Sequence, residues 1–212
     1  MKSAIPEALR RGLLALVVLA GAGTTVVVVD QAAVAEAQRN AYIQAVAADP
    51  GTSEAVKIAM VMGAYYESSY RHIGTPYIDK LGRGQPLTVC NGITGAGVVA
   101  GKTYAPADCY AIEKGRYLAA EKIAVRVLGR WQTYGPFAKA TFLDFIHNKG
   151  EANFLASTML RKANAGDLVG ACAENPRWNR GTVGGVSMVL PGLELRGKSN
   201  AEICSQWTAR TL

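Results

Sequence analysis

Histidine is scarce in this chain, and its basic residues are not gathered into runs. His72 and His147 are the only histidines among 212 residues, which argues against a histidine metal site. The formal net charge is +7, but at most two basic residues are adjacent at any point. The sequence has no ladder of alternating aromatic and basic residues, so binding to nucleic acid is not expected. Neither a metal ion nor an organic cofactor is expected.

The chain also lacks an internal repeat and a low-complexity linker. Half of its residues are hydrophobic, which is enough to bury a core. A chain of this length suits one compact domain with an N-terminal extension. We therefore divide it into a membrane or signal segment at residues 1–35 and a folded domain at residues 36–212.

An uncharged stretch, Gly12–Val29, directly follows Arg10 and Arg11. Its length is at the lower end of what spans a bilayer, and the two arginines would stay on the cytoplasmic side. The same stretch could instead be the apolar region of a signal peptide, because residues 33–35 and 35–37 both fit a small-residue cleavage pattern. Either way we expect export, and whether the segment is cleaved or released intact stays open.

All four cysteines lie in the part of the chain that would be exported. They are Cys90, Cys109, Cys172 and Cys204, in an arrangement unlike a metal site. Of the three possible pairings we expect the one that closes two local loops, Cys90–Cys109 and Cys172–Cys204. Each disulfide would add about 3 kcal/mol of stability by restricting the unfolded chain. Four reduced cysteines in the core are the alternative.

Residues 54–67 are predicted to form a helix that is apolar on nearly all sides. Thr52 or Ser53 can cap its first turn, where Glu54 is favourably placed. A helix of this kind belongs in the core of the domain. It carries Glu67 to the edge of that core, where apolar surroundings would keep a carboxyl group protonated, as a general acid requires.

The rest of the pattern predicts an α+β protein that is mostly helical. Residues 68–104 are rich in Gly and Pro, with β-prone pieces at 88–90 and 98–104, so we expect a small, irregular sheet region. The other expected helices lie at about 31–47, 106–128, 136–147, 151–163, 166–173 and 200–208, with a Gly-rich stretch at 181–192.

Several short motifs follow one another in order along the chain. They are YID at 77–79, GQPLTVCNG at 84–92, FIHNKG at 145–150, STML at 157–160, RW at 177–178 and PGL at 191–193. Through them the chain from Asp79 to Trp207 resembles the phage lysozyme (endolysin) family, glycoside hydrolase family 24. The resemblance implies a lysozyme-like fold with a small irregular β region and a helical lobe. It also implies that residues 36–212 are the catalytic domain.

The N-terminal segment resembles the signal-arrest-release anchors of some endolysins of this family. These anchors first tether the enzyme to the inner membrane and later let it escape. The resemblance implies a protein of the host inner membrane, held through residues 12–29, and then of the periplasm. The expected partners are the inner membrane and the glycan strands of peptidoglycan, and we expect a monomer.

The family's catalytic set, carried over to this sequence, becomes Glu67, Asp79 and Thr88. Eleven residues separate Glu67 from Asp79 and eight separate Asp79 from Thr88, three more in each gap than in the family pattern. Surface loops can absorb such insertions at small entropic cost. In the implied roles Glu67 donates a proton, Asp79 holds a water or stabilises positive charge, and Thr88 orients the water.

Structural roles stay open for each of these residues. Glu67 could be a solvated helix-end residue, Asp79 a loop-stabilising acceptor, and Thr88 an ordinary strand residue. The resemblance implies a muramidase that hydrolyses the β-1,4 bond between N-acetylmuramic acid and N-acetylglucosamine for host lysis. The alternatives are a lytic transglycosylase acting on the same bond and a non-catalytic, membrane-anchored peptidoglycan-binding protein.

Overall fold

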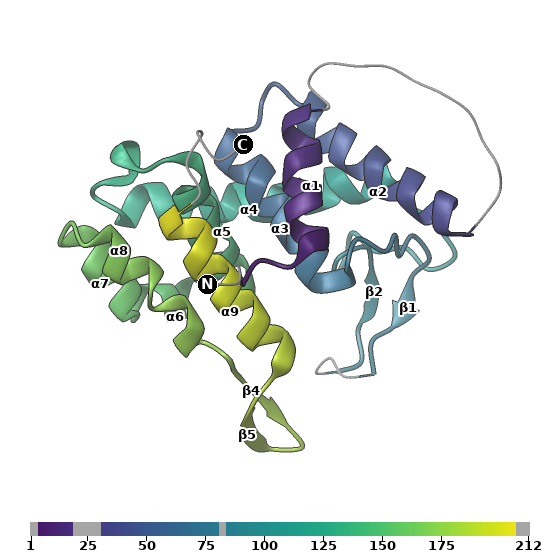
Figure 1. The fold of residues 1–212 in the computed structure, drawn as a ribbon. Coiled ribbons are helices and arrows are strands. Elements are labelled where there is room, and N and C mark those ends of the chain that lie inside the picture. The colour runs from purple at the N-terminus through teal and green to yellow at the C-terminus, as the bar shows by residue number, and fades with distance from the viewer. Residues whose placement is uncertain (1–3, 19–30, 81–83, 207–212) are drawn as a thin grey trace.

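The computed structural model describes residues 4–18, 31–80 and 84–206 (Figure 1). Helices dominate it, and the strands are short, so the predicted α+β class is confirmed. The helices are α1 (Glu7–Val18), α2 (Gln31–Ala48), α3 (Glu54–Ser68), α4 (Pro106–Val127), α5 (Pro136–Lys149), α6 (Glu151–Leu155), α7 (Thr158–Asn164), α8 (Leu168–Cys172) and α9 (Pro191–Gln206). The strands are β1 (Tyr77–Ile78), β2 (Leu87–Val89), β3 (Ile93–Thr94), β4 (Arg180–Val183) and β5 (Val186–Val189).

Helix α3 lies in the core, as its composition predicts. Ser53 caps it by accepting a hydrogen bond from the backbone N–H of Val56 at 3.2 Å. Its residues from Ala55 to Ala64 are almost all buried, and it packs against α5 as well as α4 and α1. The helix ends where Ser69 takes the left-handed conformation, with φ of 52°. This end is the point from which Glu67 projects.

The three strands β1, β2 and β3 form a small antiparallel sheet, in that order. In Figure 1 this sheet lies on one side of α3, and helices α6–α8 lie on the other. The segment after α3 is tied to the sheet region through Ile73, whose carbonyl accepts from Cys90 N at 2.8 Å. It is also tied through Gly74, whose carbonyl accepts from Tyr104 N at 2.8 Å.

The prediction of a β-prone piece at 98–104 is wrong. This segment has no strand; instead it wraps around the ring of Tyr104, which is 1% exposed. The Tyr104 hydroxyl accepts from Val99 N at 2.9 Å and donates to Gly97 O at 3.0 Å. These bonds satisfy backbone groups that a strand would otherwise pair with a neighbour.

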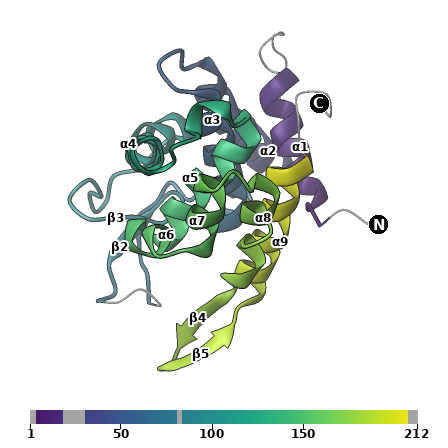
Figure 2. The same cartoon turned by 90° about the vertical axis from the view of Figure 1, so that its left-hand side faces the viewer.

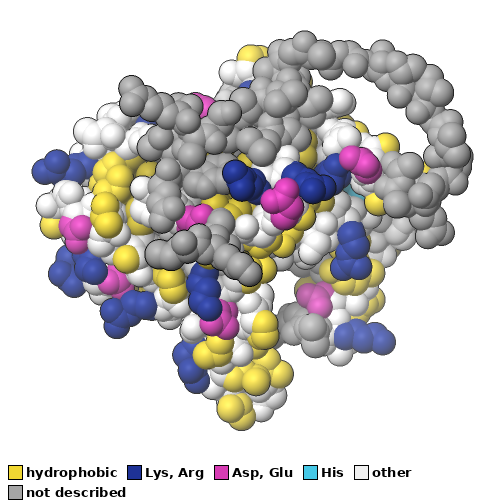
Figure 3. Space-filling model, viewed as in Figure 1, with side chains coloured by type: hydrophobic (Ala, Val, Ile, Leu, Met, Phe, Trp, Pro, Cys, Tyr) yellow, Lys and Arg dark blue, Asp and Glu magenta, His cyan; other side chains and the backbone are white. Residues whose placement is uncertain are grey.

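The C-terminal part differs from the prediction in three places. The single helix expected at 151–163 is two, α6 and α7, because Ser157 starts α7 by accepting from Leu160 N at 3.1 Å. The Gly-rich stretch forms the hairpin β4–β5, which turns at two glycines with positive φ, Gly184 and Gly185. Helix α9 begins at Pro191, earlier than expected. The hairpin projects from the body of the protein and carries exposed apolar side chains (Figures 2 and 3).

Both expected disulfides are present. Cys90–Cys109 joins the end of the sheet to α4, and Cys172–Cys204 joins α8 to α9. The pairing that closes two local loops is therefore confirmed. The sulfurs of Cys90 and Cys109 also lie near the Glu113 carboxylate, within range of a common metal ion. They are bonded to each other, so they cannot act as thiolate ligands.

The first described helix packs onto the folded domain. Leu9 and Leu13 of α1 are 0% and 1% exposed, and the helix contacts α2 and α3. The segment before it is tied to α9, where Ser199 Oγ donates to Ala4 O at 3.0 Å. Across residues 4–18, 31–80 and 84–206, no helix is both long and apolar enough to cross a bilayer. Most of the predicted anchor, residues 19–29, lies outside the described residues.

Candidate active site

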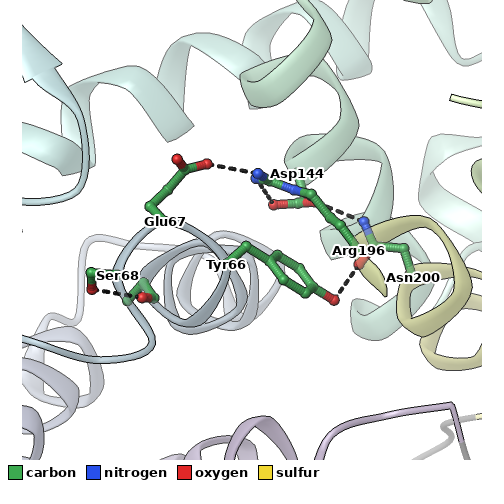
Figure 4. Close-up of polar contacts among 7 residues, drawn as sticks. Tyr66, Glu67, Ser68, Asp144, Arg196 and Asn200 are labelled. Carbon is green, nitrogen blue, oxygen red and sulfur yellow. Dashed lines mark hydrogen bonds and ion pairs between the residues drawn. The ribbon is translucent and has the colours of Figure 1, made fainter. Parts of the chain in front are cut away.

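Glu67 is the last residue but one of α3, and its side chain is 32% exposed. The buried helix behind it fixes its position at the edge of the core. The apolar surroundings expected for its carboxyl group are not what the structure shows. Glu67 Oε1 instead accepts a hydrogen bond from Arg196 Nη1 at 2.6 Å (Figure 4).

Arg196 comes from α9 and is held by a second carboxylate. Its Nε and Nη2 donate to the two oxygens of Asp144 at 2.9 and 2.7 Å, which is a bidentate pair. Asp144, on α5, is 0% exposed and also accepts from Asn200 Nδ2 at 2.7 Å. Tyr66 closes the network by donating to Asn200 Oδ1 at 2.8 Å, and its ring lies under the guanidinium. Three helices thus converge on Glu67 through one arginine.

The charges of this network compensate for its burial. Burial alone would lower the pKa of Arg196, but the charge and hydrogen bonds of Asp144 and the charge of Glu67 outweigh it and raise the pKa above its usual value. Breaking such a pair by removing one partner leaves a buried charge without compensation. Arg196 is therefore a fixed cation beside the Glu67 carboxyl group.

Asp79 directly follows β1 and is partly exposed. Its backbone N–H donates to Pro86 O at 3.0 Å, which extends the pairing of β1 with β2 by one residue. Tyr77 pairs with Thr88 in the same ladder. Asp79 is two residues after Tyr77, so it lies diagonally across the strand pair from Thr88, two positions further along. The sheet thus brings together two of the three predicted site residues.

Thr88 is central in the sheet, paired with Tyr77 on one side and Thr94 on the other. It is 2% exposed, and its hydroxyl donates to Pro86 O at 3.1 Å. A hydroxyl retains acceptor capacity when it donates. Any water that Thr88 orients would therefore donate to its oxygen.

An open groove of about 280 Å³ lies between α4 and α5. Its lining includes Arg116, His147 and Glu151, with aliphatic side chains between them. The ring of His147 stacks on Tyr117 at 4.3 Å between centroids. Burial lowers the pKa of His147, although the charges of Asp144 and Glu67 act against it.

The sequence analysis did not identify Arg196 or Asp144 as site residues. One signal was available: Asp144 is the one acidic residue in a mostly apolar helical run, FAKATFLDFI. A buried carboxylate needs a charged partner. The partner's identity depends on how α5 and α9 pack, and the local pattern does not contain that information.

The sequence model of the Phage lysozyme family matches residues 72–200, which is more than half of the chain. The protein therefore belongs to the phage lysozyme family. The predicted enzyme class, a lysozyme-type (muramidase) glycoside hydrolase, is confirmed at this level. The matched region contains Asp79 and Thr88 and begins five residues after Glu67.

Several curated relatives carry the name SAR-endolysin. That of Enterobacteria phage PA-2 is 37% identical over 132 residues, covering 61% of this chain and 73% of the relative. That of Enterobacteria phage P21 is 34% identical over 138 residues, with the same coverage of 61% and 73%. That of Bacteriophage PS34 is 31% identical over 182 residues, covering 81% of this chain and 96% of the relative.

Solved structures show the same fold. The active form of the P1 phage endolysin Lyz superposes with a TM-score of 0.63 at 18% identity, covering 78% of this chain and 92% of Lyz. An endolysin from Escherichia coli O157:H7 phage FAHEc1 gives a TM-score of 0.62 at 17% identity, covering 75% and 95%. The predicted lysozyme-like fold is confirmed.

Proposed function

We propose that the protein is an exported endolysin that hydrolyses the β-1,4 bond between N-acetylmuramic acid and N-acetylglucosamine in peptidoglycan. One observation carries the proposal. A partly exposed carboxyl group, Glu67, is held at the end of a buried helix by an arginine that is itself fixed by the buried Asp144. A group that transfers a proton to a sugar oxygen needs this combination of access and fixed position.

In this proposal Glu67 is the general acid. Arg196 contacts Oε1, so Oε2 is the oxygen that carries the proton to the leaving glycosidic oxygen. After the bond breaks, the carboxylate that forms lies beside the Arg196 cation. A fixed positive charge that faces developing negative charge stabilises the transition state.

Asp79 acts on the other side of the reaction. Its carboxylate activates a water or stabilises the oxocarbenium-like charge on the sugar, as the second carboxylate of a glycosidase does. Thr88 accepts a hydrogen bond from that water. The strand ladder that relates Asp79 to Thr88 supports this assignment, and so does membership of the family.

A lytic transglycosylase is the second candidate. Thr88 is 2% exposed and its hydroxyl already donates to a backbone carbonyl, which suits a reaction that needs no positioned water. Such an enzyme uses one acid/base group and leaves an anhydro-sugar. Mass spectrometry of the released muropeptides separates the two reactions, because hydrolysis adds one water for each bond cleaved and the anhydro-sugar product lacks that water.

Export and membrane attachment belong to the same proposal. The uncharged Gly12–Val29 segment behind two arginines suits an anchor in the host inner membrane, from which the enzyme passes to the periplasm. The name SAR-endolysin, carried by the relatives, agrees with this route. The substrate partner is the glycan strand, and the enzyme acts as a monomer.

Replacing Glu67 by Gln tests the catalytic assignment. Gln can still accept a hydrogen bond from Arg196, so we expect an unchanged fold and melting temperature. Lytic activity on purified sacculi should fall by about 1000-fold or more, because the proton donor is lost. The matched control is Glu54→Gln at the exposed start of the same helix, which should clear sacculi at the wild-type rate. Full activity in Glu67→Gln would exclude Glu67 as the acid.

A further inference from the structure

Glu113 is a buried acidic residue that the proposed reaction does not use. It lies on α4, is 2% exposed, and accepts three hydrogen bonds. Asn91 supplies two of them, from its backbone N to Oε1 at 3.0 Å and from its Nδ2 to Oε2 at 3.1 Å. Tyr42 of α2 supplies the third, from its hydroxyl to Oε2 at 2.5 Å. A carboxylate can accept all three donors at once, whereas a neutral side chain cannot.

The same face of α4 holds the whole turn that follows β2. Residues four and then three positions apart lie one above the other on a helix, and Cys109, Glu113 and Arg116 have this spacing. Cys109 is bonded to Cys90, and Glu113 binds the next residue of the turn, Asn91. Arg116 then donates to the carbonyl oxygen of Gly92 in this turn at 3.5 Å and to that of Thr94, in the adjoining strand β3, at 3.2 Å. Consecutive positions of one helix face thus bind consecutive parts of one turn.

This turn begins in an unfavourable backbone conformation. Cys90 has a backbone φ of 55°, in the left-handed region that residues other than Gly rarely adopt. Cys90 is two residues after Thr88, so a change in the turn would move the end of β2 that carries Thr88. The bonds on either side, to Cys109 and from Asn91 to Glu113, hold the turn in this conformation.

We propose that Glu113 is a positioning residue for the glycosidase site: its carboxylate holds Asn91, and with it the end of β2 that bears Thr88. Because Tyr42 of α2 also binds Glu113, the position of the Glu113 carboxylate depends on how α2 packs on the domain. Helix α2 is the first described helix after the Gly12–Val29 segment. The inference rests on the proposed function, because it assigns Thr88 to that reaction. Glu113 itself contacts no substrate.

Glu113→Gln is the direct test. The glutamine replaces charge-assisted hydrogen bonds with weaker neutral ones. Its NH2 group faces a donor of Asn91 unless the side-chain amide of Asn91 turns over so that its oxygen accepts. We expect kcat on soluble glycan oligomers to fall by about 10- to 100-fold, the range seen when a reacting group is displaced by about an ångström. KM should stay within about twofold of wild type, because the displaced residue acts in the reaction and not in initial binding.

A second substitution restores the pairing with reversed polarity. In the double variant E113Q/N91D, the NH2 group of the introduced glutamine donates to the carboxylate of the introduced aspartate, while the backbone N–H at position 91 binds the glutamine oxygen. We expect kcat to return to within about threefold of wild type, which a general loss of stability would not allow. Glu121→Gln, the same change on α4 at a residue that binds Ser53 instead of the turn, is the matched control and should leave kcat unchanged.

The outcomes separate this inference from the proposed function. An active wild type with unchanged kcat in Glu113→Gln overturns the inference alone, and so does a folded double variant that stays as slow as the single one. An inactive wild type overturns the proposed function. If Glu113→Gln fails to fold, Tyr42→Phe takes its place: it removes one of the three donors and should lower kcat by a smaller factor with the fold intact.

Discussion

The guanidinium of Arg196 and the carboxyl group of Glu67 lie 2.6 Å apart, although 129 positions separate them in the chain. The pair joins the end of α3 to α9. Because Arg196 also binds Asp144, the position of the candidate acid depends on the packing of α3, α5 and α9 against one another. A change that shifts the packing of these three helices around Arg196 should therefore affect activity as well as stability.

Arg196→Lys should show whether the positive charge at position 196 is sufficient, or whether the hydrogen-bonding geometry of the guanidinium is also needed. A lysine keeps the positive charge, but its single ammonium group cannot bind Asp144 in bidentate fashion and reach Glu67 at the same time. Asp144 is 0% exposed, so weakening its pairing should lower the free energy of unfolding by about 3 kcal/mol. Lytic activity should fall by about 10-fold or more. Urea unfolding and sacculus clearing measure the two effects.

Lys198→Gln is the control for this prediction. Lys198 pairs with Glu194 on the exposed side of the same helix, where an ion pair contributes less than about 1 kcal/mol. Its loss should leave activity unchanged. Equal effects of Arg196→Lys and Lys198→Gln would show that the network around Asp144 has no special role.

The elements that the sequence predicted well are those with a local cause. Ser53 caps α3 and the apolar run that follows is buried, so the position of Glu67 at the edge of the core could be deduced from the residues of that helix and its cap alone. The disulfides followed from their short loops and the exported context. Both inferences needed only neighbours in the chain.

The features that escaped prediction are not visible in simple local patterns of residue type. Arg196 reaches Glu67 and Asp144 only after α9 has packed on α5. The hairpin β4–β5 was not predicted because its glycines weaken the sequence pattern of a strand. Two of them, Gly184 and Gly185, adopt the positive φ that its turn requires. The segment 98–104 has β-prone residues, but the buried Tyr104 ring organises it into turns. Of these three features, only the position of Arg196 depends on residues far away in the chain.

The two disulfides should differ in what their loss affects. Replacing Cys172 and Cys204 by Ser opens a link between residues 32 positions apart, which by chain entropy contributes about 3.5 kcal/mol. We expect a lower melting temperature with unchanged kcat below it. Replacing Cys90 and Cys109 by Ser should lower kcat as well, because Cys90 lies two residues after Thr88. Calorimetry and oligomer hydrolysis, carried out on both variants, check this difference.

Gly12 of α1 lies against Tyr70, and the contact leaves no room for a side chain. A Cβ atom at residue 12 would lie 2.0 Å from the Tyr70 hydroxyl oxygen. Gly12→Ala should therefore destabilise the protein by about 1–3 kcal/mol, even though Ala favours helices. In a Tyr70→Ala background the same change should cost little. Thermal unfolding of the full-length chain measures both values.

Gly115→Ala provides the opposite case on α4. A Cβ atom there meets nothing within 4 Å, so the change should stabilise the protein by up to about 1 kcal/mol. If Gly12→Ala were equally stabilising, α1 would not be packed on the domain as described.

His147 should make stability depend on pH just below neutrality. Burial lowers its pKa from the ordinary value of 6.5, with the charge of Arg196 acting in the same direction and those of Asp144 and Glu67 opposing it. Between the lowered value and 6.5, the unfolded chain holds a proton on His147 that the folded protein does not. The free energy of unfolding should therefore rise with pH across this window and fall as the pH drops below about 6.5. Urea titrations from about pH 5 to 8 should show this slope in the wild type and in His72→Gln, and a smaller slope in His147→Gln; an unchanged slope in His147→Gln would assign the dependence to another group.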